Sequence, residues 1–336
     1  MLSSFLSGLL IRHLGIGGLL SLSCAAMAGT LLVYAVTPLW WVFVIFSAVG
    51  GLGAGAIDAG INTYIAKYHS TRMMQWLHAS FGVGITSGPF IMTMGINATS
   101  HWQSGYFVVS VAMLILSVIF LFTKDTWEGI SASSREEDHD ENNPSLSETI
   151  KSNQVLLSVA LFFIYTGVEL GLGLWIYSLL TESRGVAPEV AGIVTGGYWA
   201  MFTVGRIFAG WYAKMIDIRK LIYLSISLAL FGVALLLTDS SLIITILGVT
   251  LVGFAIAPIF PGLVSSTTSR VGFRHQANTI GMQIAAAGLG VAVVPSIAGV
   301  LARIFGLEVI PLYLLSTLAL LLLVFIISNS HSGENT

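Results

Sequence analysis

The chain has 336 residues, of which 55% are hydrophobic and only 9% are charged, whereas a soluble globular domain carries about 25% charged residues. Charges this scarce cannot cover the surface of a soluble particle, so most of the surface is expected to face lipid. The formal net charge of −2 leaves no basic excess for binding a nucleic-acid backbone, and the single cysteine, Cys24, excludes an intrachain disulfide. Composition therefore excludes a soluble enzyme, a nucleic-acid-binding protein and a secreted disulfide-rich scaffold.

The first segment, residues 1–11, is apolar but is only about half as long as a membrane-crossing helix, which needs about 20 apolar residues. Arg12 and His13 end it. A secretory signal peptide would instead begin with positive charge and end in a small-residue cleavage site. Two interpretations are open: a short interfacial helix, or the end of a span whose beginning is missing.

Ten further stretches are long and apolar enough to cross a membrane, and short loops with turn or charged residues separate them. They are residues 16–36, 39–66, 75–97, 103–123, 154–180, 189–213, 218–237, 241–268, 275–302 and 308–328. The predicted fold is an all-α integral membrane protein of about 11 helices, the first of which is short.

Residues 124–153 interrupt this pattern with an acidic, polar segment that contains REEDHDENNPSLSE. Such a segment cannot bury enough apolar area to fold alone. We interpret it as a cytoplasmic linker between an N-terminal bundle, 1–123, and a C-terminal bundle, 154–328. Residues 329–336 are predicted to form a cytoplasmic tail.

The distribution of basic residues predicts the orientation in the membrane. With the loop after residue 11 on the cytoplasmic side, eleven Lys and Arg residues are cytoplasmic and only Arg184 and Arg303 are external. Basic loops stay in the cytoplasm, so this asymmetry places the C-terminus there. The predicted location is the plasma (inner) membrane, crossed several times.

A weak internal repeat relates the two halves, as is common in transporters. Gly8 before a basic turn matches Gly210 before another, and Gly51 before a Gly/Ala-rich run matches Gly253, both at an offset of 202 residues. In this register the second half has six spans and the first has four and a half. The first span and part of the second are therefore expected to be missing.

The two glycine-led basic turns lie where the major facilitator superfamily carries its cytoplasmic loop motif, and the chain resembles that superfamily. Three segments are similar to its fucose/glucose permease branch of sugar–proton symporters: GAGAIDAGIN at 53–62, YTGVELGLGLWI at 165–176 and TGGYWAMFTVGRIFAGW at 195–211. The resemblance implies two six-helix bundles, the N-terminal one incomplete here, and transport rather than enzymatic activity.

Two acidic residues, Asp58 and Glu169, lie well inside predicted spans. A charge in hydrocarbon costs on the order of 3 kcal/mol, so each carboxyl needs a reason to be there. One reason is exchange of a coupling proton, and the alternative is a neutral or hydrogen-bonded strut between helices. By resemblance, Asp58 occupies the place of an acid implicated in proton coupling in the fucose permeases, and Glu169 matches a glutamate of glucose-transporting relatives.

Other polar and aromatic residues are candidates for a solute cavity. Asn62 lies one helical turn after Asp58, so both are expected to face one cavity. His78, near the end of its span, is predicted to bind solute or titrate, or else to form an ordinary hydrogen bond. The remaining candidates for lining the cavity are Tyr165, Trp199, Asn278 and Gln283.

Arg206 resembles the gating arginine of the superfamily, although a pairing that fixes helix packing is the plainer interpretation. Pro258 and Pro261 are predicted to kink the span at 241–268. We predict no cofactor and no metal site, because the histidines in loops lack metal-ligand spacing.

These features predict a secondary transporter that moves a small polar solute, with sugar favoured, by alternating access. The coupling cation is expected to be a proton rather than sodium, and the protein a monomer in the lipid bilayer with no nucleic-acid partner. Two alternatives stay open: an exporter of drugs or metabolites with the same fold, and a truncated membrane protein that does not transport.

Overall fold

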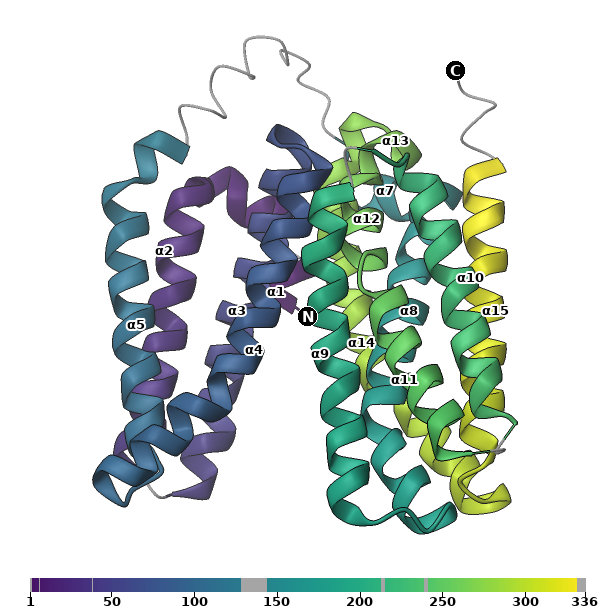
Figure 1. The fold of residues 1–336 in the computed structure, drawn as a ribbon. Coiled ribbons are helices and arrows are strands. Elements are labelled where there is room, and N and C mark those ends of the chain that lie inside the picture. The colour runs from purple at the N-terminus through teal and green to yellow at the C-terminus, as the bar shows by residue number, and fades with distance from the viewer. Residues whose placement is uncertain are drawn as a thin grey trace. The chain divides into compact units, whose positions relative to one another are not determined.

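The computed structural model describes residues 2–5, 7–37, 39–127, 144–212, 215–238 and 241–330. Within these ranges the chain is almost wholly helical and contains no strand (Figure 1). The long helices are α2 (Ser7–Val36), α3 (Trp40–Tyr68), α4 (Thr71–Thr99), α5 (Gln103–Phe122), α8 (Asn153–Ser178), α9 (Pro188–Tyr212), α10 (Ile218–Leu236), α11 (Leu242–Ile256), α14 (Gln276–Phe305) and α15 (Val309–Ser330). The short ones are α1 (Leu2–Phe5), α7 (Leu146–Ile150), the π-helical turn η1 (Leu179–Ser183), α12 (Ile259–Ser265), α13 (Thr267–Val271) and the 3-10 turn η2 (Phe273–His275).

Each predicted span coincides with helical structure. Eight helical segments of the described chain are long and apolar enough to cross a membrane. The other two predicted spans, 75–97 and 189–213, correspond to α4 and α9. The predicted all-α membrane fold is confirmed.

Of the apolar segment at 1–11, residues 2–5 form α1 and residues 7–11 begin α2. A sharp bend follows at Gly15, where φ is 67°. Glycine adopts this left-handed conformation without the steric cost that a Cβ would add. The first membrane-length segment begins at His13, and both interpretations of the residues before it stay open.

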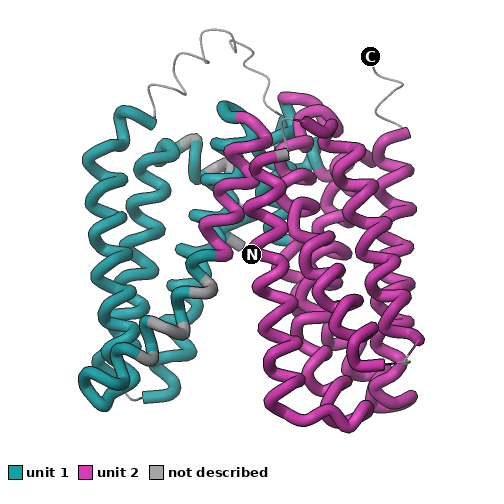
Figure 2. The backbone as a smooth tube through the Cα atoms, in the orientation of Figure 1, with its two compact units in different colours: residues 1–69, 83–149, 274–285 teal, residues 70–82, 150–273, 286–336 magenta. Residues whose placement is uncertain are grey.

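The chain forms two compact units (Figure 2). Unit 1 comprises residues 1–69, 83–149 and 274–285, and unit 2 comprises residues 70–82, 150–273 and 286–336. Both α4 and α14 therefore contribute to both units. The predicted domain boundaries at 123 and 154 stay predictions, because residues 128–143 of the linker lie outside the described residues, as do 331–336 of the tail.

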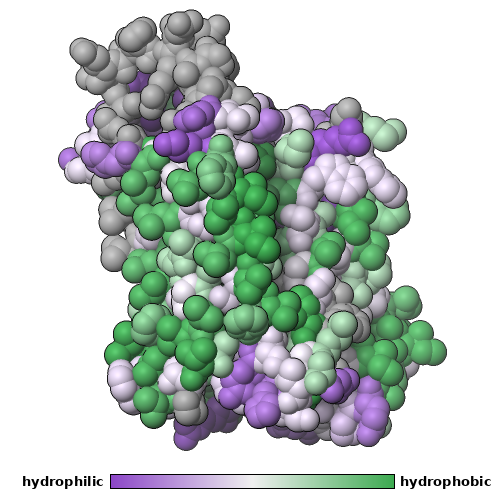
Figure 3. Space-filling model, turned by 90° about the vertical axis from the view of Figure 1, so that its left-hand side faces the viewer, coloured by the Kyte–Doolittle hydropathy of each residue, from purple (hydrophilic) through white to green (hydrophobic). Residues whose placement is uncertain are grey.

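In unit 1, α5 buries its small and polar residues and exposes its large apolar ones, which is the reverse of a helix on the surface of a soluble protein. Its buried residues are small or polar, Gly105, Ser110 and Ser117, whereas its exposed side chains include Phe107, Val108, Leu114, Ile115, Ile119 and Phe122. Figure 3 views the molecule from this side and shows a broad apolar band between hydrophilic ends. Such a surface is stable only against lipid.

The buried serines join α5 to α2. Ser21 and Ser117 bond reciprocally, each hydroxyl donating to the other's backbone carbonyl at 2.9 and 2.8 Å. The hydroxyl of Ser110 donates to the carbonyl of Ala28 at 2.7 Å. Lipid provides no hydrophobic force between helices, so small side chains and short hydrogen bonds of this kind hold them together.

In unit 2, glycines allow close approach of helix backbones. A Cβ built on Gly253 of α11 would lie 2.5 Å from the carbonyl oxygen of Tyr198 on α9, and one on Gly248 would lie 2.7 Å from that of Gly232 on α10. These contacts fix α9, α10 and α11 at short separations.

The predicted kink at Pro258 and Pro261 is present as a break in the helix. α11 ends at Ile256 and α12 begins at Ile259, with Pro258 as the residue before it. A proline lacks the N–H that would bond the preceding turn. Carbonyl groups near the break are therefore free for other partners, which are described with the site.

Gly290 provides a test of this close packing. A Cβ there would overlap the carbonyl oxygen of Phe163 on α8 and approach the hydroxyl of Thr166. We expect Gly290→Ala to lower the free energy of unfolding by about 2 kcal/mol, read as a lower apparent melting temperature of the purified protein. Gly192→Ala, where a Cβ has open space, is the control. Equal melting of the two variants would contradict the packing described.

An ion pair joins the loop between α14 and α15 to the end of η1. Arg184 donates to both carboxylate oxygens of Glu308 at 2.9 and 2.7 Å. The same guanidinium donates to the carbonyl of Leu236 at 2.7 Å and to the hydroxyl of Thr245 at 3.1 Å. One arginine thus ties four elements at the predicted external end.

The hydrogen bond from Arg184 holds the pKa of Glu308 below its usual value. The resulting stabilisation is fully present above the pKa of an unfolded glutamate, about 4.3, and is lost as the pH falls through the lower folded value. Glu308→Gln should therefore lower the melting temperature at pH 7, by the equivalent of about 1 kcal/mol for this partly exposed pair, and much less below pH about 4. Glu182→Gln is the control. If Glu308→Gln lowered the melting temperature equally at every pH, the ionised Glu308 would not be the source of the stabilisation.

Candidate functional site

The centre of unit 2 holds a buried pair of opposite charges. Glu169 lies on α8 and is only 7% exposed, and Arg206 lies on α9 and is only 3% exposed. The Arg206 Nη2 and Glu169 Oε1 atoms are 3.9 Å apart. This is an ion pair without a direct short hydrogen bond. A buried charge of either sign is costly without its partner, so the two residues depend on each other.

Two aromatic rings and a backbone carbonyl surround the side chain of Arg206. Its guanidinium lies over the ring of Phe202 at 4.1 Å and over that of Phe81 at 5.6 Å, and Nη1 donates to the carbonyl of His78 at 3.2 Å. The Nε atom has no hydrogen-bond partner among the described residues. The predicted structural pairing of Arg206 is therefore observed, although one donor remains available.

Two tyrosines fix the backbone around Glu169. The hydroxyl of Tyr198 donates to the carbonyl of Glu169 at 2.7 Å. The hydroxyl of Tyr165, one turn before Glu169, donates at 3.0 Å to the carbonyl of Ile256, at the break between α11 and α12. Tyr165 is 1% exposed, so in this structure it is a strut between helices rather than a residue of an open cavity.

The other side of the break is held by Gln75, from the part of α4 that belongs to unit 2. Its amide Nε2 donates to the carbonyl of Pro258 at 3.2 Å, while its Oε1 is buried without a partner among the described residues. The ring of His78 lies 4.9 Å from that of Phe260. Gln75 and Tyr198 were not among the sequence candidates, although Gln75 lies three residues before His78 and so faces the same way.

In unit 1, Asp58 and Asn62 lie on one face of α3, as their spacing predicts, and they are hydrogen-bonded to each other. The side-chain amide of Asn62 donates both to the carbonyl and to Oδ1 of Asp58, each at 2.8 Å. Asn62 is 1% exposed, while Asp58 is half-buried on α3. One helical turn thus presents a carboxylate and its hydrogen-bond donor together.

The remaining candidates occupy different surroundings. Trp199 packs over Gly173 on α8, where a Cβ would meet the indole ring, and Gln283 is fully buried in unit 1. Asn278 departs from the expectation of a cavity residue. Its amide donates to the carbonyl of Pro144 at 3.1 Å and to the hydroxyl of Thr149 at 3.3 Å, so it holds the end of the linker segment.

Comparison with known families places the chain in one of them. The profile described as "Major Facilitator Superfamily" matches residues 1–224 and 157–335. The chain belongs to the major facilitator superfamily. It is therefore an integral, multi-pass membrane protein of a transporter family rather than an enzyme, and the resemblance inferred from its motifs is confirmed.

The relatives within the superfamily are distant. "Bypass of stop codon protein 6" of Saccharomyces cerevisiae is 23% identical over 90% of this chain and 67% of that protein. The "Glucose/mannose transporter GlcP" of Bacillus subtilis is 23% identical over 88% of this chain and 76% of that protein. "Sodium-dependent glucose transporter 1" of Homo sapiens is 24% identical over 76% of this chain and 55% of that protein. The chain thus matches only about half to three quarters of the length of these relatives.

Solved structures show the same fold. The transporter FucP in its outward conformation has a TM-score of 0.80 at 13% identity, covering 98% of this chain and 86% of that one. The proton:xylose symporter XylE has a TM-score of 0.72 at 14% identity, covering 96% of this chain and 82% of that one. At this identity the likeness supports the fold and not the substrate.

The ion pair in unit 2 predicts a distinct pattern of stabilities. Arg206→Gln leaves Glu169 buried without its counter-charge and should cost about 3 kcal/mol or more of unfolding free energy. The double variant Arg206→Gln/Glu169→Gln removes both charges and should regain a large part of that loss. Melting temperatures of the purified variants test this. Simple additivity of the two single effects would contradict the pairing.

Proposed function

We propose that the protein is a secondary active transporter that moves a sugar-like solute by alternating access and couples it to a proton. The Glu169–Arg206 pair carries the proposal, because a membrane-buried ion pair ringed by hydrogen-bonding and aromatic side chains suits recognition of a neutral polyhydroxyl solute. The names of two relatives, a glucose/mannose transporter and a sodium-dependent glucose transporter, support sugar as the solute class.

Glu169 is the proposed acceptor for solute hydroxyl groups. A carboxylate accepts hydroxyl hydrogen bonds strongly, and Arg206 keeps this one in place without using short hydrogen bonds to both of its oxygens. Trp199 contacts α8 at Gly173, one helical turn from Glu169. An indole ring beside a hydroxyl acceptor is a suitable surface for the apolar face of a sugar ring.

Asp58 is the proposed site of the coupling proton. Its Oδ1 accepts a hydrogen bond from the amide of Asn62 at 2.8 Å. Protonation of that oxygen would weaken the bond, so the hydrogen bonding within α3 would respond to the proton. A proton rather than sodium is proposed, in keeping with the proton:xylose symporter whose fold this chain shares.

The bundle organisation, location and orientation form part of the same proposal. Residues 1–123 and 154–328 are proposed as the two bundles, with 124–153 as the linker and 329–336 as the tail. The protein is proposed to act as a monomer in the plasma membrane with its C-terminus in the cytoplasm, as the excess of basic residues on that side favours.

Uptake into proteoliposomes tests the role of Asp58. The protein is reconstituted and given radiolabelled D-glucose, D-mannose or L-fucose, with and without an inwardly directed proton gradient. Wild-type protein should accumulate at least one of these sugars above equilibrium. Asp58→Asn should abolish accumulation but retain exchange of labelled for unlabelled sugar, because exchange needs no net proton movement.

The matched control is Asp125→Asn, which removes an exposed carboxylate just after α5 and should accumulate sugar as the wild type does. Full gradient-driven accumulation by Asp58→Asn would rule out its coupling role. Failure of the folded wild-type protein to move any of the three sugars would instead refute the sugar assignment.

A further inference from the structure

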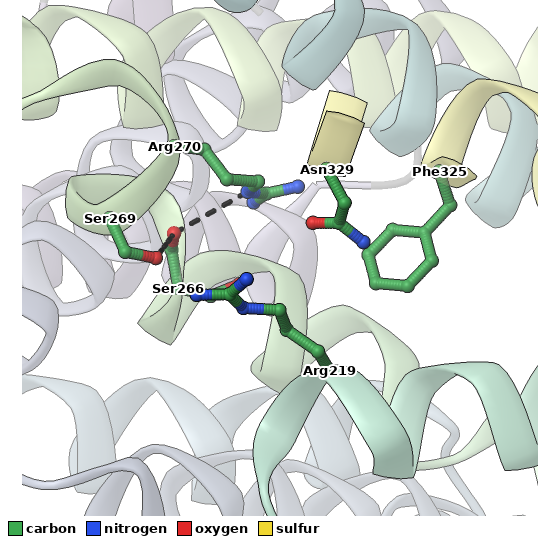
Figure 4. A pocket seen from close by; sticks show the side chains of 6 residues that line it. All are labelled: Arg219, Ser266, Ser269, Arg270, Phe325 and Asn329. Atoms are coloured by element: carbon green, nitrogen blue, oxygen red, sulfur yellow. Dashed lines mark hydrogen bonds between the residues drawn. The ribbon is translucent and has the colours of Figure 1, made fainter. Parts of the chain in front are cut away.

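A small pocket lies in unit 2 where three spans end, away from Glu169 and Arg206. Figure 4 shows its lining: Arg219 of α10, Ser266, Ser269 and Arg270 at the junction of α12 with α13, and Phe325 and Asn329 of α15. The space between these side chains is narrow, and part of it is open to solvent. The predicted topology puts this end of the spans at the cytoplasmic side.

Arg270 is a buried cation with an unused donor. It is only 6% exposed, its Nε donates to the carbonyl of Ser266 at 3.4 Å, and its Nη2 donates to the carbonyl of Leu263. These bonds cap the C-terminus of α12, where a basic side chain is favourable. Capping does not account for Nη1, which is buried without a partner among the described residues.

The charge of Arg270 is also poorly compensated. The residue lies in α13, outside the membrane-length segments Leu242–Ser265 and Phe273–Phe305. Burial lowers the pKa of its guanidinium from 12.5 to about 9. An anion beside it would offset this desolvation.

Arg219 adds a second positive charge to the same pocket, and Figure 4 shows both guanidinium groups bordering the space between the lining side chains. No carboxylate occurs among the described residues that line it. Asp217, two residues before Arg219, uses its carboxylate to cap α10, accepting from the backbone N–H groups of Arg219 at 3.0 Å and Lys220 at 3.3 Å. Two like charges facing one space without a counter-ion repel each other.

We propose that this pocket binds a phosphate group, carried either by an anionic lipid headgroup or by a small soluble molecule. The two guanidinium groups and the second N–H of the Asn329 amide, whose first N–H bonds the hydroxyl of Tyr223 at 3.2 Å, are the donors available to it. The hydroxyls of Ser266 and Ser269 already donate to backbone carbonyls. The planar guanidinium fits the paired oxygens of phosphate. The ends of spans lie at the level of lipid headgroups, and the cytoplasmic leaflet is the one rich in anionic lipid. The proposal does not depend on sugar transport.

Thermal stability of the full-length protein tests the proposal without any transport measurement. The protein in uncharged detergent is melted with inorganic phosphate and with sodium chloride at equal ionic strength. It is also melted in vesicles of phosphatidylcholine alone and of phosphatidylcholine mixed with phosphatidylglycerol. Phosphate, phosphatidylglycerol or both should raise the melting temperature of the wild type.

The decisive comparison is Arg219→Gln against Lys220→Gln. Both remove one exposed positive charge from the first turn of α10, but only Arg219 lines the pocket. Arg219→Gln should weaken the affinity obtained from titration by about 10-fold or more, the equivalent of one charge-assisted hydrogen bond, and Lys220→Gln should not. Arg270→Lys, which keeps the charge but loses the paired donors, should weaken the affinity as well.

The two media identify the source of the phosphate group. Stabilisation only in phosphatidylglycerol vesicles supports a lipid headgroup, and stabilisation by inorganic phosphate in detergent supports a soluble ligand. No stabilisation in either medium overturns the proposal. An equal loss of affinity in Lys220→Gln and Arg219→Gln also overturns the proposal, because binding would then depend on the general surface charge and not on the pocket. If Arg270→Lys does not fold, the Arg219 and Lys220 variants decide the matter alone.

Discussion

The structure of unit 2 depends on one electrostatic requirement: a carboxylate buried among membrane helices needs a positive partner at close range. Arg206 supplies it to Glu169 across the contact between α9 and α8. Gly205, the residue before Arg206, makes this geometry possible, because a Cβ there would lie 2.6 Å from the carbonyl oxygen of Phe254 on α11. The close approach of α9 to α11 thus positions Arg206, whose positive charge Glu169 on α8 requires.

The break between α11 and α12 follows from the same need to satisfy every polar group in the absence of water. The prolines interrupt the helical hydrogen bonds, and at the break the hydroxyl of Tyr165 bonds the carbonyl of Ile256. Gln75 adds a side-chain bond to the carbonyl of Pro258, which also accepts the backbone N–H of Gly262 at 3.0 Å. Irregular backbone at membrane depth is tolerated where protein groups bond it in this way. The broken helix is therefore part of the frame that surrounds the ion pair.

Local features of the fold and site could be predicted from the sequence, whereas pairings between distant segments could not. Hydropathy located the spans, and the four-residue spacing of Asp58 and Asn62 predicted their shared face, because helical geometry alone fixes both. The partner of Glu169 is 37 positions away along the chain, and no local pattern identifies it. Asn278 illustrates the same limit. Its amide donates to residues of the linker, and a polar residue within an apolar stretch does not by itself reveal such a distant partner.

Equilibrium binding of radiolabelled sugar to the purified protein tests most directly whether Glu169 is the solute acceptor. Loss of a hydrogen bond to a charged acceptor costs about 1.5–3 kcal/mol, so Glu169→Gln is predicted to weaken binding about 10-fold to 100-fold. Glu189→Gln, at the exposed start of α9, is predicted to bind as the wild type does. Binding by folded Glu169→Gln protein with unchanged affinity would show that the buried pair serves packing alone, and would contradict this account of the site.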